Sequence, residues 1–179
     1  MSYSKTMILN LLLAVLGAVL IKITKAGVPE LKRYKENPLR QVSAGIVIML
    51  VLLGCSALRS GFYGEPLTTL AFIGYPFRTA LKFVAWSFTV GISEELFFRC
   101  WLQKFIERIS GSEWVGLMAA TLVFGLSHCI FGFSLEHAVY TSLIGFVFGF
   151  VFIKWKGCTI YSLMIAHSLY DMIISTYSP

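Results

Sequence analysis

Long apolar blocks, separated by short charged or Gly/Pro-containing stretches, dominate this chain. The blocks cover residues 7–21, 42–58, 67–77, 79–93, 114–133, 138–153 and 159–177. A helix that crosses the hydrocarbon core of a bilayer needs about 20 mostly apolar residues, within a range of about 17–25. Apolar residues gathered into blocks of this length, rather than dispersed at a regular period, predict membrane-spanning helices.

The block pattern predicts an all-α fold, a polytopic membrane helical bundle of about six transmembrane helices. We expect the spans at residues 6–24, 42–58, 81–106, 114–133, 138–153 and 159–177. The segment 66–79 is broken by Pro76 and Arg78 and is too short to cross, so we expect it to be interfacial or re-entrant. The first block runs into "KITKAG" without a small-residue cleavage site, which favours an uncleaved anchor over a signal peptide.

Composition and charge agree with an integral, multi-pass membrane protein. The chain is 57% hydrophobic and 13% charged, against about 45–50% and about 25% in ordinary globular domains. Alternate loops carry most of the basic residues, namely Lys22, Lys25, Lys32, Arg33, Lys35, Arg40, Lys104, Arg108, Lys154 and Lys156. The positive-inside rule makes this side cytoplasmic and predicts that both termini are non-cytoplasmic. The net charge of +6 therefore indicates topology and contact with anionic lipids rather than nucleic acid binding.

The stretch "GISEELFFRC", residues 91–100, places three charged side chains inside the third predicted span. Each ionised side chain at the centre of a span costs about 2.5–3.5 kcal/mol on insertion scales. Glu95 and Arg99 are four residues apart, so they can form an ion pair along one helix face. Glu94 is five residues before Arg99, about 140° away around an α-helix, which leaves its carboxylate without that partner. An unpaired carboxylate inside a membrane is a functional hypothesis.

Two later spans also carry ionisable residues: His128, and the pair His167 and Asp171, four residues apart. Taken singly, each histidine fits an interhelical hydrogen bond, and the pair fits a local i, i+4 contact. Ionisable residues in three of the last four predicted spans favour a common site instead. His137, next to Glu136 before the fifth span, is interpreted as solvated or interfacial.

Three short motifs carry a family resemblance. "EELFFR" at 94–99 fits EExxxR, "FGLSH" at 124–128 fits FxxxH, and "HSLYD" at 167–171 fits HxxxN/D. In this order and on predicted spans, they make residues 81–175 resemble the CPBP family of intramembrane endopeptidases. That family includes type II CAAX prenyl endopeptidases and bacterial Abi or self-immunity proteins. The first two spans match nothing specific in that family. We therefore expect an N-terminal part, residues 1–80, with anchor spans, a basic cytoplasmic loop and the interfacial segment, followed by a CPBP-like catalytic helical core at 81–179.

The resemblance implies an intramembrane peptidase of the glutamic type that hydrolyses a peptide bond of a membrane-associated or lipidated substrate. By analogy, Glu94 would act as the general base on a water molecule, and His128 would help to hold that water. Glu95 and Arg99 would brace the site. The substrate would be a prenylated CAAX peptide, a precursor peptide or a membrane-anchored sorting tail.

His167 and Asp171 would lie around the developing oxyanion by the same analogy. Prenyl-processing members tend to have Asn where this chain has Asp171, and an ionised carboxylate would repel an oxyanion. Our sequence-based hypothesis is that Asp171 holds His167 through the i, i+4 contact and favours the protonated imidazole as the oxyanion donor.

Other functions stay open from the sequence. Glu94, His128, His167 and Asp171 are all competent zinc ligands, so a zinc-dependent intramembrane protease is the nearest alternative. The absence of HExxH favours a site without a metal cofactor, and so does the origin of the four residues on three predicted helices, where only His167 and Asp171 have a local i, i+4 spacing. A proton-coupled membrane protein would also place acids and histidines in the membrane, although no repeat is visible. A non-catalytic immunity or scaffold protein would keep the fold without needing Glu94.

Overall fold

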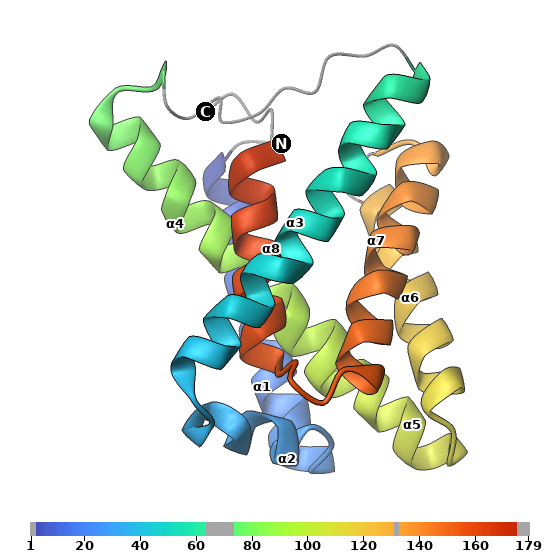
Figure 1. Ribbon diagram of the computed structural model, residues 1–179. Coiled ribbons are helices and arrows are strands. Elements are labelled where there is room, and N and C mark those ends of the chain that lie inside the picture. Colours follow the sequence, from blue (N-terminus) through green and yellow to red (C-terminus); the bar gives the residue numbers. More distant parts are fainter. Residues whose placement is uncertain (1–2, 64–73, 131–132, 175–179) are drawn as a thin grey trace.

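A computed structural model describes residues 3–63, 74–130 and 133–174 (Figure 1). All regular secondary structure in this described part is helical, which confirms the all-α fold class. The elements are α1 (Tyr3–Thr24), α2 (Val28–Leu31), η1 (Lys32–Lys35), α3 (Pro38–Tyr63), α4 (Phe77–Glu94), η3 (Glu95–Gln103), α5 (Lys104–Ser110), α6 (Glu113–Ile130), α7 (Leu135–Lys154) and α8 (Ile160–Ile174). Most of the expected interfacial segment 66–79 lies outside the described residues.

Four helices are long and apolar enough to cross a membrane. They are α1, α3, α6 and α7, and they correspond to four of the six predicted spans. The sixth predicted span is described as α8, whose 15 residues make a shorter apolar helix. These helices identify an integral membrane protein with a polytopic helical bundle.

The third predicted span is longer than the apolar pattern indicated. Helix α4 begins at Phe77, directly after Pro76, instead of at the predicted residue 81. Proline has a fixed φ and lacks an N–H group, so it is well suited to the start of a helix. The chain then continues through η3 and α5 to Ser110 without leaving a helical conformation. One continuous helical rod therefore carries all three charges of the "GISEELFFRC" stretch.

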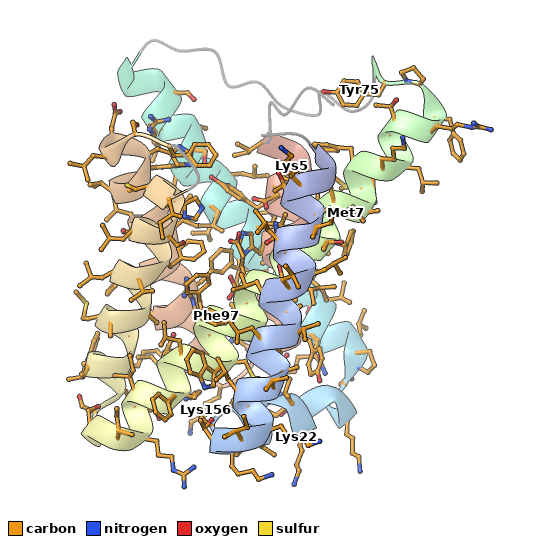
Figure 2. All side chains as sticks on the ribbon, turned by 180° about the vertical axis from the view of Figure 1, so that it is seen from behind. Lys5, Met7, Lys22, Tyr75, Phe97 and Lys156 are labelled. Atoms are coloured by element: carbon orange, nitrogen blue, oxygen red, sulfur yellow. The ribbon has the colours of Figure 1, made fainter. Side chains whose placement is uncertain are left out.

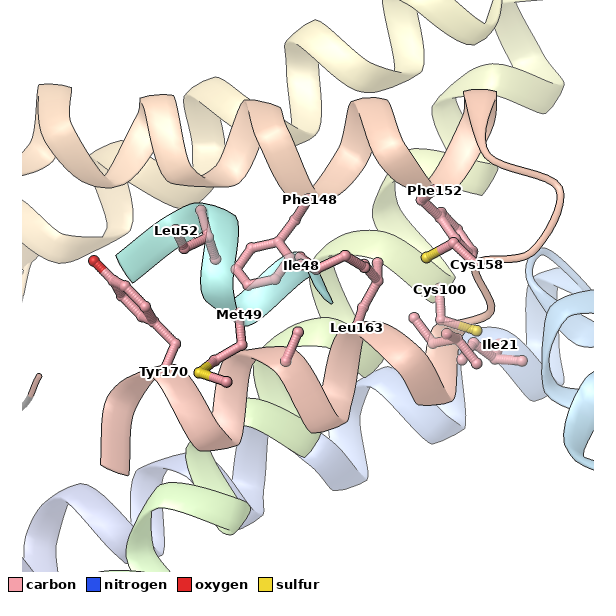
Figure 3. Packing of buried hydrophobic residues seen from close by; sticks show 12 residues of the cluster. Ile21, Ile48, Met49, Leu52, Cys100, Phe148, Phe152, Cys158, Leu163 and Tyr170 are labelled. Carbon is pink, nitrogen blue, oxygen red and sulfur yellow. The ribbon is translucent and has the colours of Figure 1, made fainter. Parts of the chain in front are cut away.

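Helix α8 packs between α3 and α4, whereas α6 and α7 pack against each other as a hairpin (Figure 1). Helix α1 covers α4 and η3 from the other side, where it passes Phe97 (Figure 2). The main apolar core lies where α3, α7 and α8 meet. Figure 3 shows Phe148 of α7 directed toward Leu52 of α3 and Leu163 of α8, and all three are fully buried.

Helices α4 and α8 approach each other closely at Gly91. A Cβ atom at Gly91 would lie 2.7 Å from the backbone nitrogen of Ser168, a distance that side chains do not tolerate. Only glycine permits this backbone approach. The contact fixes the end of α4, where Glu94 lies, beside the face of α8 that carries His167.

The loops that carry the predicted cytoplasmic charges lie together at one end of the bundle. Lys22 and Lys156 lie at this end, whereas Lys5 lies at the opposite end (Figure 2). Arg33 ties two of these loops together by donating hydrogen bonds of 3.0 Å to the carbonyl oxygens of Cys158 and Lys156. Its hydrogen bonds to Glu36 lower the pKa of that exposed carboxyl group. The assignment of this end to the cytoplasm stays a prediction.

Candidate active site

Glu95 and Arg99 lie on η3, a π-helical segment within the continuous helix. Such segments occur frequently at functional sites because they change the register of the side chains. The expected ion pair is present: Arg99 Nε lies 3.8 Å from Glu95 Oε2, and both side chains are fully buried. This distance is too long for a hydrogen bond. None of the three guanidinium nitrogens has a hydrogen-bond partner among the described residues, and the guanidinium lies 4.9 Å from the centre of the Phe124 ring.

His167 is the hydrogen-bond partner of Glu95. The distance from His167 Nδ1 to Glu95 Oε1 is 2.8 Å. An ionised carboxylate can only accept, so Nδ1 carries the proton and donates it. The imidazole also stacks on Phe148, with ring centroids 5.1 Å apart. Glu95 and Phe148 together fix the orientation of the ring and direct Nε2 away from Glu95.

The Nε2 atom of His167 faces two further carboxylates. Glu94 Oε2 and Asp171 Oδ2 each lie 3.7 Å from it. The i, i+4 contact between His167 and Asp171 is therefore present, but the hydrogen bond that holds the imidazole comes from Glu95. The motif spacing did not indicate this partner, because Glu95 was expected to be occupied by Arg99 alone.

Glu94 differs from Glu95 in its surroundings. Its side chain is 15% exposed, whereas that of Glu95 is completely buried. Within residues 3–63, 74–130 and 133–174, the Glu94 side chain makes no hydrogen bond. Its contact with His167 Nε2, at 3.7 Å, is too long for one. We call Glu94, Glu95, Arg99, His167 and Asp171 the charged cluster. Of the two glutamates, Glu94 is the one that can take an additional partner.

His128 lies beside the charged cluster, separated from it by an aromatic ring. The edge-to-face contacts of Phe124 reach His128 at 5.0 Å and His167 at 6.2 Å between ring centroids. His128 Nδ1 lies 2.9 Å from the carbonyl oxygen of Phe124 and donates to it. This bond leaves Nε2 as the nitrogen that can accept a proton or a hydrogen bond. No direct hydrogen bond between His128 and Glu94 is found in the described part.

His137 is closer to the candidate site than the sequence interpretation implied. Its ring centroid lies 5.8 Å from that of His128, and its ring stacks on Phe133 at 4.4 Å. Ser134 caps α7 by accepting a hydrogen bond from the backbone nitrogen of His137. This Ser-x-x-His cap is the signal that could have placed His137 in the first turn of α7, beside the end of α6.

The ligand set considered for zinc is not gathered in one place. Among the described residues, no group of three or more His, Cys, Asp or Glu side chains has a geometry suited to a metal ion. Glu94 and Asp171 both approach His167, but Phe124 separates His128 from them.

A family model for type II CAAX prenyl endopeptidases, Rce1-like, matches residues 76–173, more than half of the chain. The chain belongs to this family. Membership makes it an intramembrane endopeptidase of the CAAX type, and it confirms the resemblance that the three motifs indicated. Comparison with curated proteins and with solved structures found no match. The matched segment includes the whole charged cluster and His128, whereas α1, α2 and α3 lie outside it.

Proposed function

We propose that this protein hydrolyses a peptide bond of a lipidated substrate through a water molecule that Glu94 activates. The observation that supports this most directly is the contrast between the adjacent glutamates. Glu95 is buried and hydrogen-bonded to His167, while Glu94 is partly exposed and makes no hydrogen bond in the described part. A general base must reach the proton that it removes, and of the two adjacent glutamates only Glu94 has a carboxylate that meets this condition.

In the proposed reaction, Glu94 accepts a proton from water as the oxygen attacks the carbonyl carbon of the scissile bond. The tetrahedral intermediate collapses as the carbon–nitrogen bond breaks, and the proton held by Glu94 passes to the leaving amine. His128 Nε2, left available by the bond from Nδ1 to Phe124, would orient the water. With these assignments, the proton taken from the water reaches the leaving amine through Glu94, so the reaction needs no separate general acid.

The developing negative charge on the carbonyl oxygen needs a donor. His167 fits this role when its Nε2 is protonated, because Glu95 already holds Nδ1 and fixes the direction of Nε2. Such preoriented donors contribute about 10²–10³ in rate. Asp171, 3.7 Å from Nε2, would favour the imidazolium by its charge, and Arg99 would balance the charge of Glu95.

The proposed substrate is a prenylated peptide with a C-terminal CAAX sequence. In such a sequence the lipid is attached to the cysteine, and three residues follow it. The family description supports this substrate class. A precursor peptide or a membrane-anchored sorting tail is the alternative that the same chemistry could process. No cofactor is required by the proposed mechanism.

The test uses purified protein in proteoliposomes with a farnesylated CAAX peptide, whose products are identified by mass. We expect the wild type to release the three C-terminal residues and Glu94→Gln to lose this activity. Full activity in preparations with far less than one zinc per chain would agree with the glutamic mechanism. Activity that follows the zinc content would instead support a metalloprotease. Cleavage by Glu94→Gln at the wild-type rate would reject the proposed base, and a wild type that cleaves no peptide would favour a transport or scaffold role.

A further inference from the structure

Helix α1 lies outside the segment that the family model matches, yet it packs along α4 and η3 beside the charged cluster. A buried polar contact joins it to the end of α4. Ser93, the residue before Glu94, places its hydroxyl oxygen 3.1 Å from Asn10 Oδ1 and donates to it. The amide nitrogen of Asn10 donates to the carbonyl oxygen of Thr6. Asn10 is buried in an apolar spanning helix, where an amide side chain typically forms a contact between helices.

Gly17 brings the backbone of α1 directly against η3. A Cβ atom at this position would lie 3.3 Å from the Cα atom of Phe97 and 3.6 Å from the carbonyl carbon of Leu96. Both are backbone atoms, which cannot turn aside as the end of a side chain can. Figure 2 shows Phe97 beside α1 at this level. The missing side chain of Gly17 therefore permits a close approach to the π-helical segment itself.

The turn after α1 contacts the second half of η3. Gly27 has a φ of 76°, and a Cβ atom there would lie 2.0 Å from the carbonyl oxygen of Cys100. The thiol of Cys100 donates to the carbonyl oxygen of Gly27 at 3.4 Å. Beyond η3, Arg108 Nη1 donates to the carbonyl oxygen of Thr24 at 2.8 Å. The contacts of α1 and its turn thus begin before the π-helical segment and end after it.

A π-helical segment of this length needs support from its neighbours. Such hydrogen bonding usually occupies a single turn, whereas η3 has nine residues. An α-helical turn holds fewer residues, so a change to α-helical hydrogen bonding would rotate the two ends of η3 relative to each other. That rotation would move Glu95 relative to His167, its partner at 2.8 Å, or Arg99 relative to the Phe124 ring. The charged cluster therefore depends on the π-helical register.

We propose that Asn10 and Gly17 are positioning residues, through which α1 holds η3 in its π-helical register and Glu94 beside His167. This inference rests on the proposed function, in which Glu94 and His167 act on the substrate. Asn10 acts through Ser93, and Gly17 acts through the backbone of η3. Helices α6 and α8 also pack against η3, but they belong to the matched segment. The active geometry of this chain then requires a helix that the family model does not include.

The test places the same side chain at two glycines. Gly17→Leu adds it against Phe97, whereas Gly54→Leu adds it on α3, where no described atom lies within 4 Å of the new Cβ atom. Leucine forms helices better than glycine, so neither change weakens its own helix. We expect Gly17→Leu to lower kcat for a farnesylated CAAX peptide about 10- to 100-fold with little change in KM, because misplaced groups slow the chemical step. Gly54→Leu should keep the wild-type kcat.

Amide hydrogen exchange of the same proteoliposomes reports on η3 without any need for activity. Exchange in residues 95–103 should become faster in Gly17→Leu than in Gly54→Leu, while exchange in α7 should stay the same. Gly17→Ala and Gly54→Ala repeat the comparison with a smaller side chain if the leucine variant does not insert into the membrane. The alanine Cβ atom at position 17 would still lie 3.3 Å from the Cα atom of Phe97.

The contact between Asn10 and Ser93 is tested by a double-mutant cycle. Asn10→Ala and Ser93→Ala should each lower kcat about 2- to 10-fold, the usual effect of one hydrogen bond. The double variant should lose no more than the more impaired single variant, because both changes remove the same bond. Losses that multiply in the double variant would refute the role of this bond.

Two other results would overturn the inference and leave the proposed function intact. The first is an equal kcat for Gly17→Leu and Gly54→Leu. The second is faster exchange in both η3 and α7, which would indicate a general loss of stability. A failure of the proposed function has a different signature, because the wild type would then cleave no peptide or Glu94→Gln would cleave it. The difference in exchange between the two glycine variants would persist in that case.

Discussion

The charged cluster can be compared with a second polar group in the apolar bundle, the hydroxyl cluster, which consists of Ser56 of α3, Tyr140 of α7 and Tyr170 of α8. The two clusters differ in how completely their polar atoms are hydrogen-bonded. In the hydroxyl cluster every oxygen has two partners at 2.7–3.1 Å. In the charged cluster the bond from His167 to Glu95, at 2.8 Å, is the only side-chain hydrogen bond among the described residues. The other contacts are 3.7–3.8 Å long, and the guanidinium nitrogens of Arg99 have no hydrogen-bond partner among the described residues.

This difference is the one expected between a structural cluster and a functional one. A buried hydroxyl group with its partners in place contributes modestly to stability and joins helices. Buried charges with incomplete pairing cost free energy, and such groups persist where the chemistry needs them. The spare hydrogen-bonding capacity of Glu94 and His167 is the property that a reacting water and an oxyanion would use.

Glu94→Gln should give the largest effect on activity and almost none on stability. Because Glu94 has no hydrogen bond in the described part, its amide should fit without strain, while loss of a general base lowers rates by about 10²–10⁴. The measurement is kcat for a farnesylated peptide in proteoliposomes, with thermal unfolding of the same sample. Glu113→Gln, which changes an exposed carboxylate paired with Lys154, is the matched control and should keep full activity.

Glu95→Gln should reduce both activity and stability. The change leaves Arg99 as an uncompensated buried charge and weakens the bond that orients His167. Breaking a buried ion pair costs about 3–5 kcal/mol. Unfolding of the purified protein in detergent measures this loss, and the double variant Glu95→Gln/Arg99→Met should recover part of it. Unchanged stability of the single variant would mean that Arg99 has another partner.

The sequence predicted the fold class better than it predicted the contacts among the ionisable residues. Long apolar blocks determine membrane helices almost by themselves, so the fold was accessible. The expected pair of Glu95 and Arg99 also follows from i, i+4 spacing. The bond between Glu95 and His167 could not be predicted, because it joins two helices and depends on the close approach at Gly91. The π-helical register of η3 likewise has no signature in the spacing of charges.

Asp171→Asn should change the pH profile of activity more than the overall stability. Asp171 lies 3.7 Å from His167 Nε2 and influences it by charge, while Glu95 retains the hydrogen bond that orients the ring. The measurement is kcat/KM across pH for the wild type and the variant. Identical profiles would assign the control of His167 to Glu95 and Glu94 alone and would refute a role for Asp171 in its protonation.

Ser56→Ala should give the smallest effect of the four variants, a loss of stability without a loss of activity. Removal of the serine hydroxyl takes one partner from each tyrosine, but Tyr140 and Tyr170 keep their mutual bond of 3.1 Å. A hydrogen-bond partner lost in a buried place costs about 1–3 kcal/mol, which thermal unfolding can detect. Since Ser56 does not touch the charged cluster in the described part, kcat for a farnesylated CAAX peptide should stay at the wild-type value. A variant with normal stability but a strongly reduced kcat would place the hydroxyl cluster within the catalytic machinery, and the distinction between the two clusters would then fail.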